Sequence, residues 1–312
     1  MKRGEGVFPQ ALDLVRLPQA FAAVPIFVPL RRGQKRCGMD VTLRAGRTEL
    51  RVRAYEQLGI GDQDVLVALL RLAEFREQTA LLGRIPTTEL GQGLRDGLEI
   101  EWWTGARPAS VVARKRRRGA VPVVPEDESM VITTSVPELA RRAGKATGGK
   151  GRKVIESVLE RLMGVSIKTT DTATGSWVYS HLIHSVRYTA EGDRLRIAIH
   201  PMLARVLLGA AVAVTRIDET DYRSLDGEVA RRLLVRLCAW VDAGTARSVR
   251  LDTLAAGVWP EPAASSYAGR YRRKQVAAAL TEIGQLEEWS VGITGQGTTA
   301  TARIARVARG ER

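Results

Sequence analysis

Cysteine, histidine and aromatic residues are scarce in this sequence. Its 312 residues include two cysteines and three histidines, and only 5% are aromatic. Cys37 and Cys238 lie far apart and outside any metal-ligand spacing, which excludes a disulfide-stapled scaffold and favours free thiols in a reducing compartment. With 45% hydrophobic and 26% charged residues, the composition is that of a globular protein long enough for two ordinary domains.

No apolar run is long enough to cross a bilayer. Residues 20–30 are apolar, but Pro25 and Pro29 interrupt them. Acidic Glu5 and Asp13 precede this stretch, which is not the layout of a signal peptide. The sequence therefore predicts a bacterial cytoplasmic protein with no membrane partner.

Acidic residues are too few to balance the basic ones. The chain has 34 Asp and Glu against 48 Lys and Arg, a net charge of +14. Such a surplus suits a polyanionic partner, because each neutralised phosphate releases counterions. Charge by itself does not distinguish a nucleic acid from an anionic membrane as the partner. The order of the predicted helices and strands decides between the two.

The histidines offer no recognisable catalytic or metal site. His181 and His184 lie in strand-like sequence, where residues three apart point to opposite faces, and His200 stands apart from both. A nickase with two histidines one residue apart and a tyrosine has no match. We expect hydrogen-bonded or core histidines, with no catalytic residue, no metal and no cofactor.

A glycine-rich segment at 144–151, GKATGGKG, is one residue short of a P-loop. Gly151 occupies the position that should bring a hydroxyl to magnesium, and the preceding sequence predicts a helix where a P-loop needs a strand. A basic turn is the better interpretation. We expect no nucleotide hydrolysis.

Proline and glycine positions suggest how the chain is divided. Residues 1–37 are predicted as an N-terminal arm or irregular packing segment. A first domain, 38–212, begins with a hairpin at 39–54 and a buried helix at 61–82, followed by a surface loop at 105–128.

The pattern sharpens after this loop. Ser135 is predicted to cap a helix at 136–143, with Glu138 as its capping-box partner. A second helix at 150–163 follows, and strand alternation then runs over 165–199 around glycine-containing turns. Helix, turn, helix and hairpin is the winged-helix order.

The same order returns in a second domain, 213–312. It has an amphipathic helix at 226–241, a short strand and helix at 249–258, a helix from about 267 to 286 and a hairpin over 289–307. The fold class predicted is therefore α+β, with two tandem winged-helix domains.

The helix at 267–286 is predicted to read DNA bases. Val276, Leu280 and Ile283 define its inward face. The opposite face has no acidic residue and carries Tyr267, Arg270, Tyr271, Lys274, Ala278 and Thr281. Arg272 and Arg273 flank this face and are predicted to contact phosphates. A merely solvated helix end at 270–274 stays open as the alternative.

The helix at 150–163 is predicted to contact the DNA backbone. Val154, Ile155, Val158 and Leu162 are expected to face inward, while Glu156 and Glu160 on the outward face would be repelled by phosphate. The phosphate contacts predicted for this domain are Lys145, Lys150, Arg152 and Lys153, with Arg114, Lys115, Arg116, Arg117 and Arg118 of the loop. Protein–protein contact, including self-association, is an equal alternative for this domain.

Longer stretches resemble the RepC initiators of IncQ-type broad-host-range plasmids. The longest is RIDETDYRSLDGEVARRLLVRLCAWVDAG at 216–244. The others are MDVTLR at 39–44, VIESVLERLMGVSI at 154–167, IHPMLARVLLG at 199–209, VRLDTLAAGVWPE at 249–261 and YRRKQVAAALTEI at 271–283.

The resemblance implies a double winged-helix protein that binds direct repeats, called iterons, in double-stranded DNA at a plasmid origin. It also implies opening of an adjacent A·T-rich segment, loading of a plasmid-encoded hexameric helicase with a primase as a further partner, and action without nucleotide hydrolysis. Two alternatives remain. A winged-helix transcriptional repressor would need only one or two operator half-sites, and a DNA-processing enzyme would show magnesium-dependent nicking.

Overall fold

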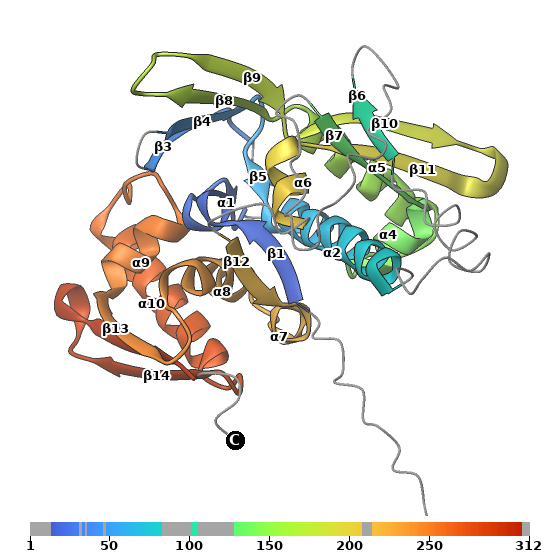
Figure 1. Ribbon diagram of the computed structural model, residues 1–312. Helices are drawn as coiled ribbons and strands as arrows, with labels where there is room; N and C mark the ends of the chain where they lie inside the picture. The colour runs from blue at the N-terminus through green and yellow to red at the C-terminus, as the bar shows by residue number, and fades with distance from the viewer. Residues whose placement is uncertain are drawn as a thin grey trace, which may run out of the picture.

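Helices and strands are interleaved along the chain, which has a mixed α and β fold (Figure 1). The computed structural model describes residues 14–30, 33–34, 36–45, 48–82, 101–104, 128–207 and 214–307. No helix within these ranges is long and apolar enough to cross a membrane.

The described helices are α1 (Gln19–Ala23), α2 (Ile60–Leu82), α4 (Val136–Arg142), α5 (Gly149–Met163), α6 (Pro201–Leu207), α7 (Glu219–Ser224), α8 (Glu228–Trp240), α9 (Leu251–Val258) and α10 (Ser266–Ile283). The described strands are β1 (Leu14–Pro18), β2 (Phe27–Val28), β3 (Met39–Ala45), β4 (Thr48–Ala54), β5 (Leu58–Gly59), β6 (Glu101–Thr104), β7 (Glu128–Thr134), β8 (Ser166–Asp171), β9 (Trp177–His181), β10 (Ile183–Thr189), β11 (Arg194–Ile199), β12 (Val214–Asp218), β13 (Thr245–Arg250), β14 (Trp289–Thr294) and β15 (Thr301–Arg306).

Helix α2 is the central element of the N-terminal half. From Ile60 to Ala73 every side chain except Gly61 is buried, and the helix packs against β1, α4, α5 and α6. Each of its buried leucines and valines contributes roughly 1.5–3 kcal/mol of hydrophobic stabilisation. The predicted buried helix is confirmed.

Strands β10, β11, β7 and β6 form a sheet in this order. Strand β7 of this sheet contacts α2, and α4 and α5 also pack against α2. The predicted helix cap is confirmed, because Ser135 Oγ accepts a hydrogen bond from the Glu138 amide at 3.2 Å. The Glu138 carboxylate itself pairs with Arg141 and Arg142. In chain order this first unit runs α2, β7, α4, α5, β10 and β11, with β6 before β7 and with β8 and β9, which belong to another sheet, between α5 and β10.

The strands predicted over 165–199 are divided between two sheets. Strands β8 and β9 extend the β3–β4 hairpin into a sheet of order β3-β4-β8-β9, whereas β10 and β11 join β7. The chain passes between the sheets at Leu182, which is fully buried. Its amide donates to Val165 O and its carbonyl accepts from His200 N, both at 3.0 Å. One continuous alternation in the sequence thus hides a change of partner strand.

Residues 14–28 of the predicted N-terminal arm form buried, regular structure. Strand β1 pairs antiparallel with β12, from Leu14 opposite Asp218 to Pro18 opposite Val214. Figure 1 shows β1, α1, β12 and α8 side by side at the middle of the molecule. The segment therefore joins the N-terminal and C-terminal halves.

Two arginines of α8 hold the end of α1. Arg232, fully buried, donates to Ala22 O at 3.1 Å and to Val24 O at 2.6 Å. Arg236 donates to Ala23 O at 2.7 Å. These carbonyls end a helix, where a cation is favourable. Burial lowers the pKa of Arg232 to about 9, which still leaves the side chain charged at neutral pH.

The C-terminal half repeats the order of the first unit. It runs α8, β13, α9, α10, β14 and β15, with a sheet of order β13-β15-β14. The two strands of the hairpin are joined through Gly295, whose φ of +76° suits glycine. The elements predicted in 213–312 are present with shifted bounds: α8 begins at Glu228 and not at 226, the strand β13 lies mostly before residue 249, and α10 ends at Ile283 and not near 286.

A buried ionic cluster lies where α2 meets the C-terminal half. The Asp64 carboxylate accepts from Lys145 Nζ at 2.9 Å, from Arg231 at 3.0 Å and from the Tyr222 hydroxyl at 2.8 Å. Burial, followed by the nearby Asp64 charge, raises the pKa of Tyr222 well above its ordinary value, so this hydroxyl stays a donor. Lys145 belongs to the first half, whereas Tyr222 and Arg231 belong to the second.

Candidate nucleic-acid interface

Helix α10 is held on the C-terminal half by one apolar stripe. Ser265 Oγ accepts from the Ala268 amide at 3.1 Å and so begins the helix. Val276, Leu280 and Ile283 are buried, as predicted, against α8, α9 and β14. This packing fixes which side of the helix points to solvent.

The six residues predicted to read bases share the solvent side of α10 and are all exposed. They are Tyr267, Arg270, Tyr271, Lys274, Ala278 and Thr281. Tyr267, at the start of the helix, is 70% exposed. The one acidic residue of the helix, Glu282, accepts from the amides of Asp226 at 2.5 Å and Gly227 at 3.2 Å, at the start of α8. The exposed side of α10 therefore carries donors and no carboxylate.

Arg272 and Arg273, predicted to contact phosphates, have partners within this half. Arg272 donates to Glu261 O at 2.6 Å and lies over the Trp259 ring, 5.4 Å from its centroid. Arg273 pairs with Asp252 at 2.8 Å and is largely covered. Both side chains fasten α10 to the segment around α9, so a phosphate contact would compete with these bonds.

Exposed arginines on the neighbouring sheet were not singled out by the sequence reasoning. Arg250 of β13 and Arg303 of β15 are exposed on the outer side of the sheet, and Ala302 and Ile304 alternate with Arg303 toward the core. This alternation of basic and apolar residues was the signal that could have found them.

The basic residues predicted at the start of α5 divide into two pairs. Lys150 and Lys153 are exposed. Arg152 pairs with Glu156 at 2.9 Å and lies 4.3 Å from the centroid of the Tyr188 ring. Lys145 is tied to Asp64 in the buried cluster. The structure thus presents two lysines outward and gives the other two cations intramolecular partners.

The inward face predicted for α5 is wrong at one position. Val154 is 44% exposed, while Ile155, Val158 and Leu162 are buried together with Leu159. The reason is helical phase: Leu159 shifts the centre of the buried stripe away from Val154. Val154 therefore lies on the outward side, next to the two exposed lysines.

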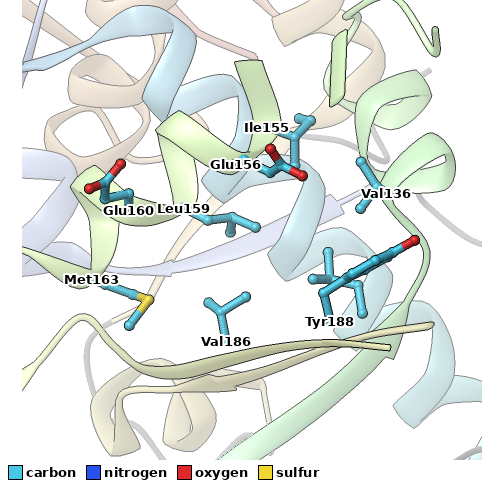
Figure 2. Close-up of a pocket in the computed structure, with 9 residues that line it drawn as sticks. Val136, Ile155, Glu156, Leu159, Glu160, Met163, Val186 and Tyr188 are labelled. Carbon is cyan, nitrogen blue, oxygen red and sulfur yellow. The ribbon is translucent and has the colours of Figure 1, made fainter. Parts of the chain in front are cut away.

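Glu156 and Glu160 border a hollow of about 280 Å³ between α5 and β10. Figure 2 shows Leu159 and Val186 pointing into this space, with the two carboxylates turned away from Val186. The carboxylates are exposed on the helix side of the hollow, where Arg152 neutralises Glu156.

The segment at 144–151 folds as a turn between two helices. Helix α4 precedes it, as predicted, and Gly151 lies buried in the first turn of α5. A Cβ added at Gly151 would overlap the carbonyl oxygen of Ala146, so the serine or threonine of a P-loop does not fit there.

His181 and His200 make local hydrogen bonds. His200 Nδ1 accepts from the Met202 amide at 2.9 Å, and its Nε2 lies 2.6 Å from Ser180 Oγ. His181 Nδ1 lies 3.2 Å from Met163 O. Within the described ranges, no group of three His, Cys, Asp or Glu side chains is arranged to hold a metal ion.

The five basic residues predicted in the 105–128 loop, Arg114, Lys115, Arg116, Arg117 and Arg118, lie outside the described residues. Their predicted phosphate contacts stay predictions.

The fold of this chain is similar to that of domains 2 and 3 of RctB. One crystal structure of these domains superposes with a TM-score of 0.51 at 8% identity, over 93% of this chain and 98% of that one. A second structure of RctB domains 2-3 gives 0.46 at 8% identity, over 90% and 95% of the two chains. The Pi initiator protein in complex with iteron DNA gives 0.42 at 12% identity, over 58% and 82%.

The sequence then identifies the family. The profile of Replication protein C (RepC) matches residues 120–303, more than half of the chain. The chain belongs to this family of replication proteins. No match was found among curated protein sequences.

Proposed function

We propose that this protein is a plasmid replication initiator that binds direct repeats in double-stranded DNA. Membership of the replication protein C family supports a role in DNA replication. The net charge of +14 supports a polyanionic partner. The observation that carries the proposal is the exposed, carboxylate-free side of α10, with Arg270 and Lys274 among its donors.

The two units are interpreted as tandem winged-helix domains. Each runs helix, strand, helix, helix and hairpin, which is the winged-helix order, and α5 and α10 occupy the position of the helix that enters the major groove. We place the boundary near residue 213, with the segment 14–28 bridging the two domains.

The two helices are assigned different roles. A groove-reading helix needs donors toward base edges and no carboxylate facing phosphate. Helix α10 meets this condition along its exposed side, whereas α5 has exposed lysines at its start and the carboxylates of Glu156 and Glu160 along its side. We therefore assign base reading to α10 and backbone contact to α5, with self-association through the first domain as the alternative role.

Substitutions on the two helices should have different consequences. Arg270→Ala or Lys274→Ala should weaken binding to the origin duplex by about 1–3 kcal/mol and relax the preference at particular base pairs. Lys150→Ala or Lys153→Ala should weaken all duplex sequences alike, because each lysine contacts phosphate. Binding to a panel of single-base-pair variants of the repeat, measured by fluorescence anisotropy, separates these patterns. If Lys153→Ala changes the base preference and Arg270→Ala does not, the assignment of the reading helix is wrong.

The initiator is proposed to work in the bacterial cytoplasm without hydrolysing nucleotide. Purified protein should show no ATP turnover, and its origin binding and opening should be unchanged when ATP is withheld. The reason is that Gly151 supplies no hydroxyl and no space for one. Lys150→Ala should lower the salt slope of DNA binding by about 1, through one lost phosphate contact. ATP turnover that disappears in Lys150→Ala would overturn this prediction.

Footprinting on the DNA that flanks the gene is the direct test of the function. An initiator should protect several adjacent repeats, and an A·T-rich segment beside them should become sensitive to single-strand probes. A repressor would protect one or two half-sites only. The IncQ-type resemblance further leads us to propose a plasmid-encoded hexameric helicase and a primase as partners, which pull-down with the tagged protein would test.

A further inference from the structure

The outer face of the β3-β4-β8-β9 sheet carries aromatic and basic side chains in register. Pairing across the four strands places three rows on this face. The rows are Thr42, Arg51, Lys168 and Tyr179; Arg44, Glu49, Thr170 and Trp177; and Asp40, Arg53, Ser166 and His181. The residues that alternate with them, such as Leu50, Val52 and Ile167, are buried in the core.

Two large rings on this face remain in solvent. Trp177 is 60% exposed and Tyr179 is 55% exposed. Their ring centroids lie 5.1 Å apart, with an interplanar angle of 72°. Exposed aromatic pairs of this size usually mark a binding surface, because burying them would be favourable. Among the described strands, β9 pairs with β8 alone, so the rings lie at an edge that another molecule can approach.

The charge around the rings is positive. Lys168 Nζ lies 5.2 Å from the Trp177 centroid and 5.5 Å from the Tyr179 centroid. Across the face, Arg44, Arg51, Arg53 and Lys168 stand against two carboxylates, those of Asp40 and Glu49. Both carboxylates are already held by arginines. The face therefore suits an anion that also has flat apolar groups.

We propose that this aromatic face, defined by Arg51, Lys168, Trp177 and Tyr179, binds single-stranded DNA. A duplex hides the flat faces of its bases, whereas an unpaired strand offers them for stacking on aromatic side chains and offers phosphates to nearby cations. Unpaired bases stack on Trp177 and Tyr179, and Lys168 contacts a phosphate. Arg51, which donates to Asp40, adds positive charge beside them. Apolar peptide partners fit less well, because covering the Lys168 ammonium with an apolar surface would remove it from water without supplying a counter-charge.

This site lies apart from the proposed duplex-binding helix. In Figure 1 the β8–β9 hairpin is at the top of the molecule, and α10 with the β13–β14 region is at the lower left. The inference extends the proposed function, since an initiator that opens an A·T-rich segment has one strand to hold. The single-strand site rests on residues other than those of α10, so either proposal can be wrong while the other one holds.

The test measures binding of a labelled oligo-dT of about 20 nucleotides by fluorescence anisotropy at low salt. Loss of one stacking ring should weaken binding on the order of tenfold, so Trp177→Ala with Tyr179→Ala should weaken it by roughly 100-fold. Trp177→Phe should keep most of the affinity, because phenylalanine still stacks. Lys168→Ala should lower the salt slope by about 0.7, the value for one phosphate of a single strand.

Tyr55→Ala is the matched control. Tyr55 is 92% exposed but lies beyond the end of β4, outside the aromatic face, so its loss should leave oligo-dT binding unchanged. Thermal unfolding of each variant checks that the sheet is intact. Origin-duplex binding should be unaffected by the Trp177 and Tyr179 changes and reduced by Arg270→Ala, which should leave oligo-dT binding intact.

The inference is overturned if the folded double variant binds oligo-dT as tightly as the parent protein. If sedimentation also shows that this variant has lost a dimer, the face is a contact between two copies of the chain.

Discussion

The affinity of this protein for origin DNA should fall by roughly 10³–10⁵ between 50 and 200 mM salt, as expected for 6–10 phosphate contacts. The exposed cations on the proposed duplex-binding units are sufficient for such a number. They include Lys150, Lys153, Arg187, Arg250, Arg270, Lys274 and Arg303. Each contact releases counterions from the duplex, which makes the logarithm of the binding constant linear in the logarithm of salt concentration. Anisotropy titrations at four or five salt concentrations measure the slope.

Lys145 and Lys150 provide a matched pair for this measurement. Lys150 is exposed, so Lys150→Ala should reduce the slope by about 1. Lys145 is held by the buried Asp64 carboxylate, so Lys145→Ala should leave the slope unchanged while lowering the stability of the fold. A nearly flat salt dependence of the parent protein would contradict the picture of an interface dominated by the DNA backbone.

Asp64→Ala should reduce the free energy of unfolding by about 3–5 kcal/mol, the cost of breaking a buried ionic pair by removing one partner. The Asp64 side chain is 1% exposed and serves Lys145, Arg231 and Tyr222 together. Its loss leaves two cations near the junction of the halves without their counter-charge. Urea unfolding followed by tryptophan fluorescence measures the change, and limited proteolysis near residue 213 should become faster. Asp64→Asn, which keeps the shape, provides a second variant if the alanine protein does not fold.

Asp40→Ala is the control for this prediction. Asp40 also accepts from two arginines, Arg51 at 2.6 Å and Arg53 at 2.9 Å, but on the solvent-exposed face of a sheet. Water screens the pair, so its loss should cost at most about 1 kcal/mol. The hydrogen bond from Arg51 lowers the pKa of Asp40 from 3.8 to about 2. Its small contribution is therefore present above about pH 4 and is lost as the pH falls toward 2. Equal destabilisation by the two variants would contradict the role assigned to the Asp64 cluster.

Much of the candidate interface could be predicted from the sequence, because a helix with one apolar stripe has its exposed side determined by the 3.6-residue period. In α10 the buried positions Val276, Leu280 and Ile283 define that side without tertiary information. The same reasoning misplaced Val154 in α5, since one further buried leucine turned the stripe. The sequence also did not predict the partners of charged residues. Nothing near Lys145, in the turn between α4 and α5, reveals that its counter-charge is Asp64 of α2.

By itself the sequence determined the local elements of the two units and the excess of positive charge. Hydrophobic periodicity, the Ser135 cap and the glycine turns act over a few residues, so they can be read along the chain. Tertiary structure alone decided which strands share a sheet and where strand β1 belongs. Strand β1 pairs with β12, about two hundred residues away, and Arg232 lies buried against the carbonyls of Ala22 and Val24. Such contacts form when surfaces of the folded halves are buried against each other. Because these surfaces do not exist before the halves fold, the neighbouring sequence does not predict the contacts.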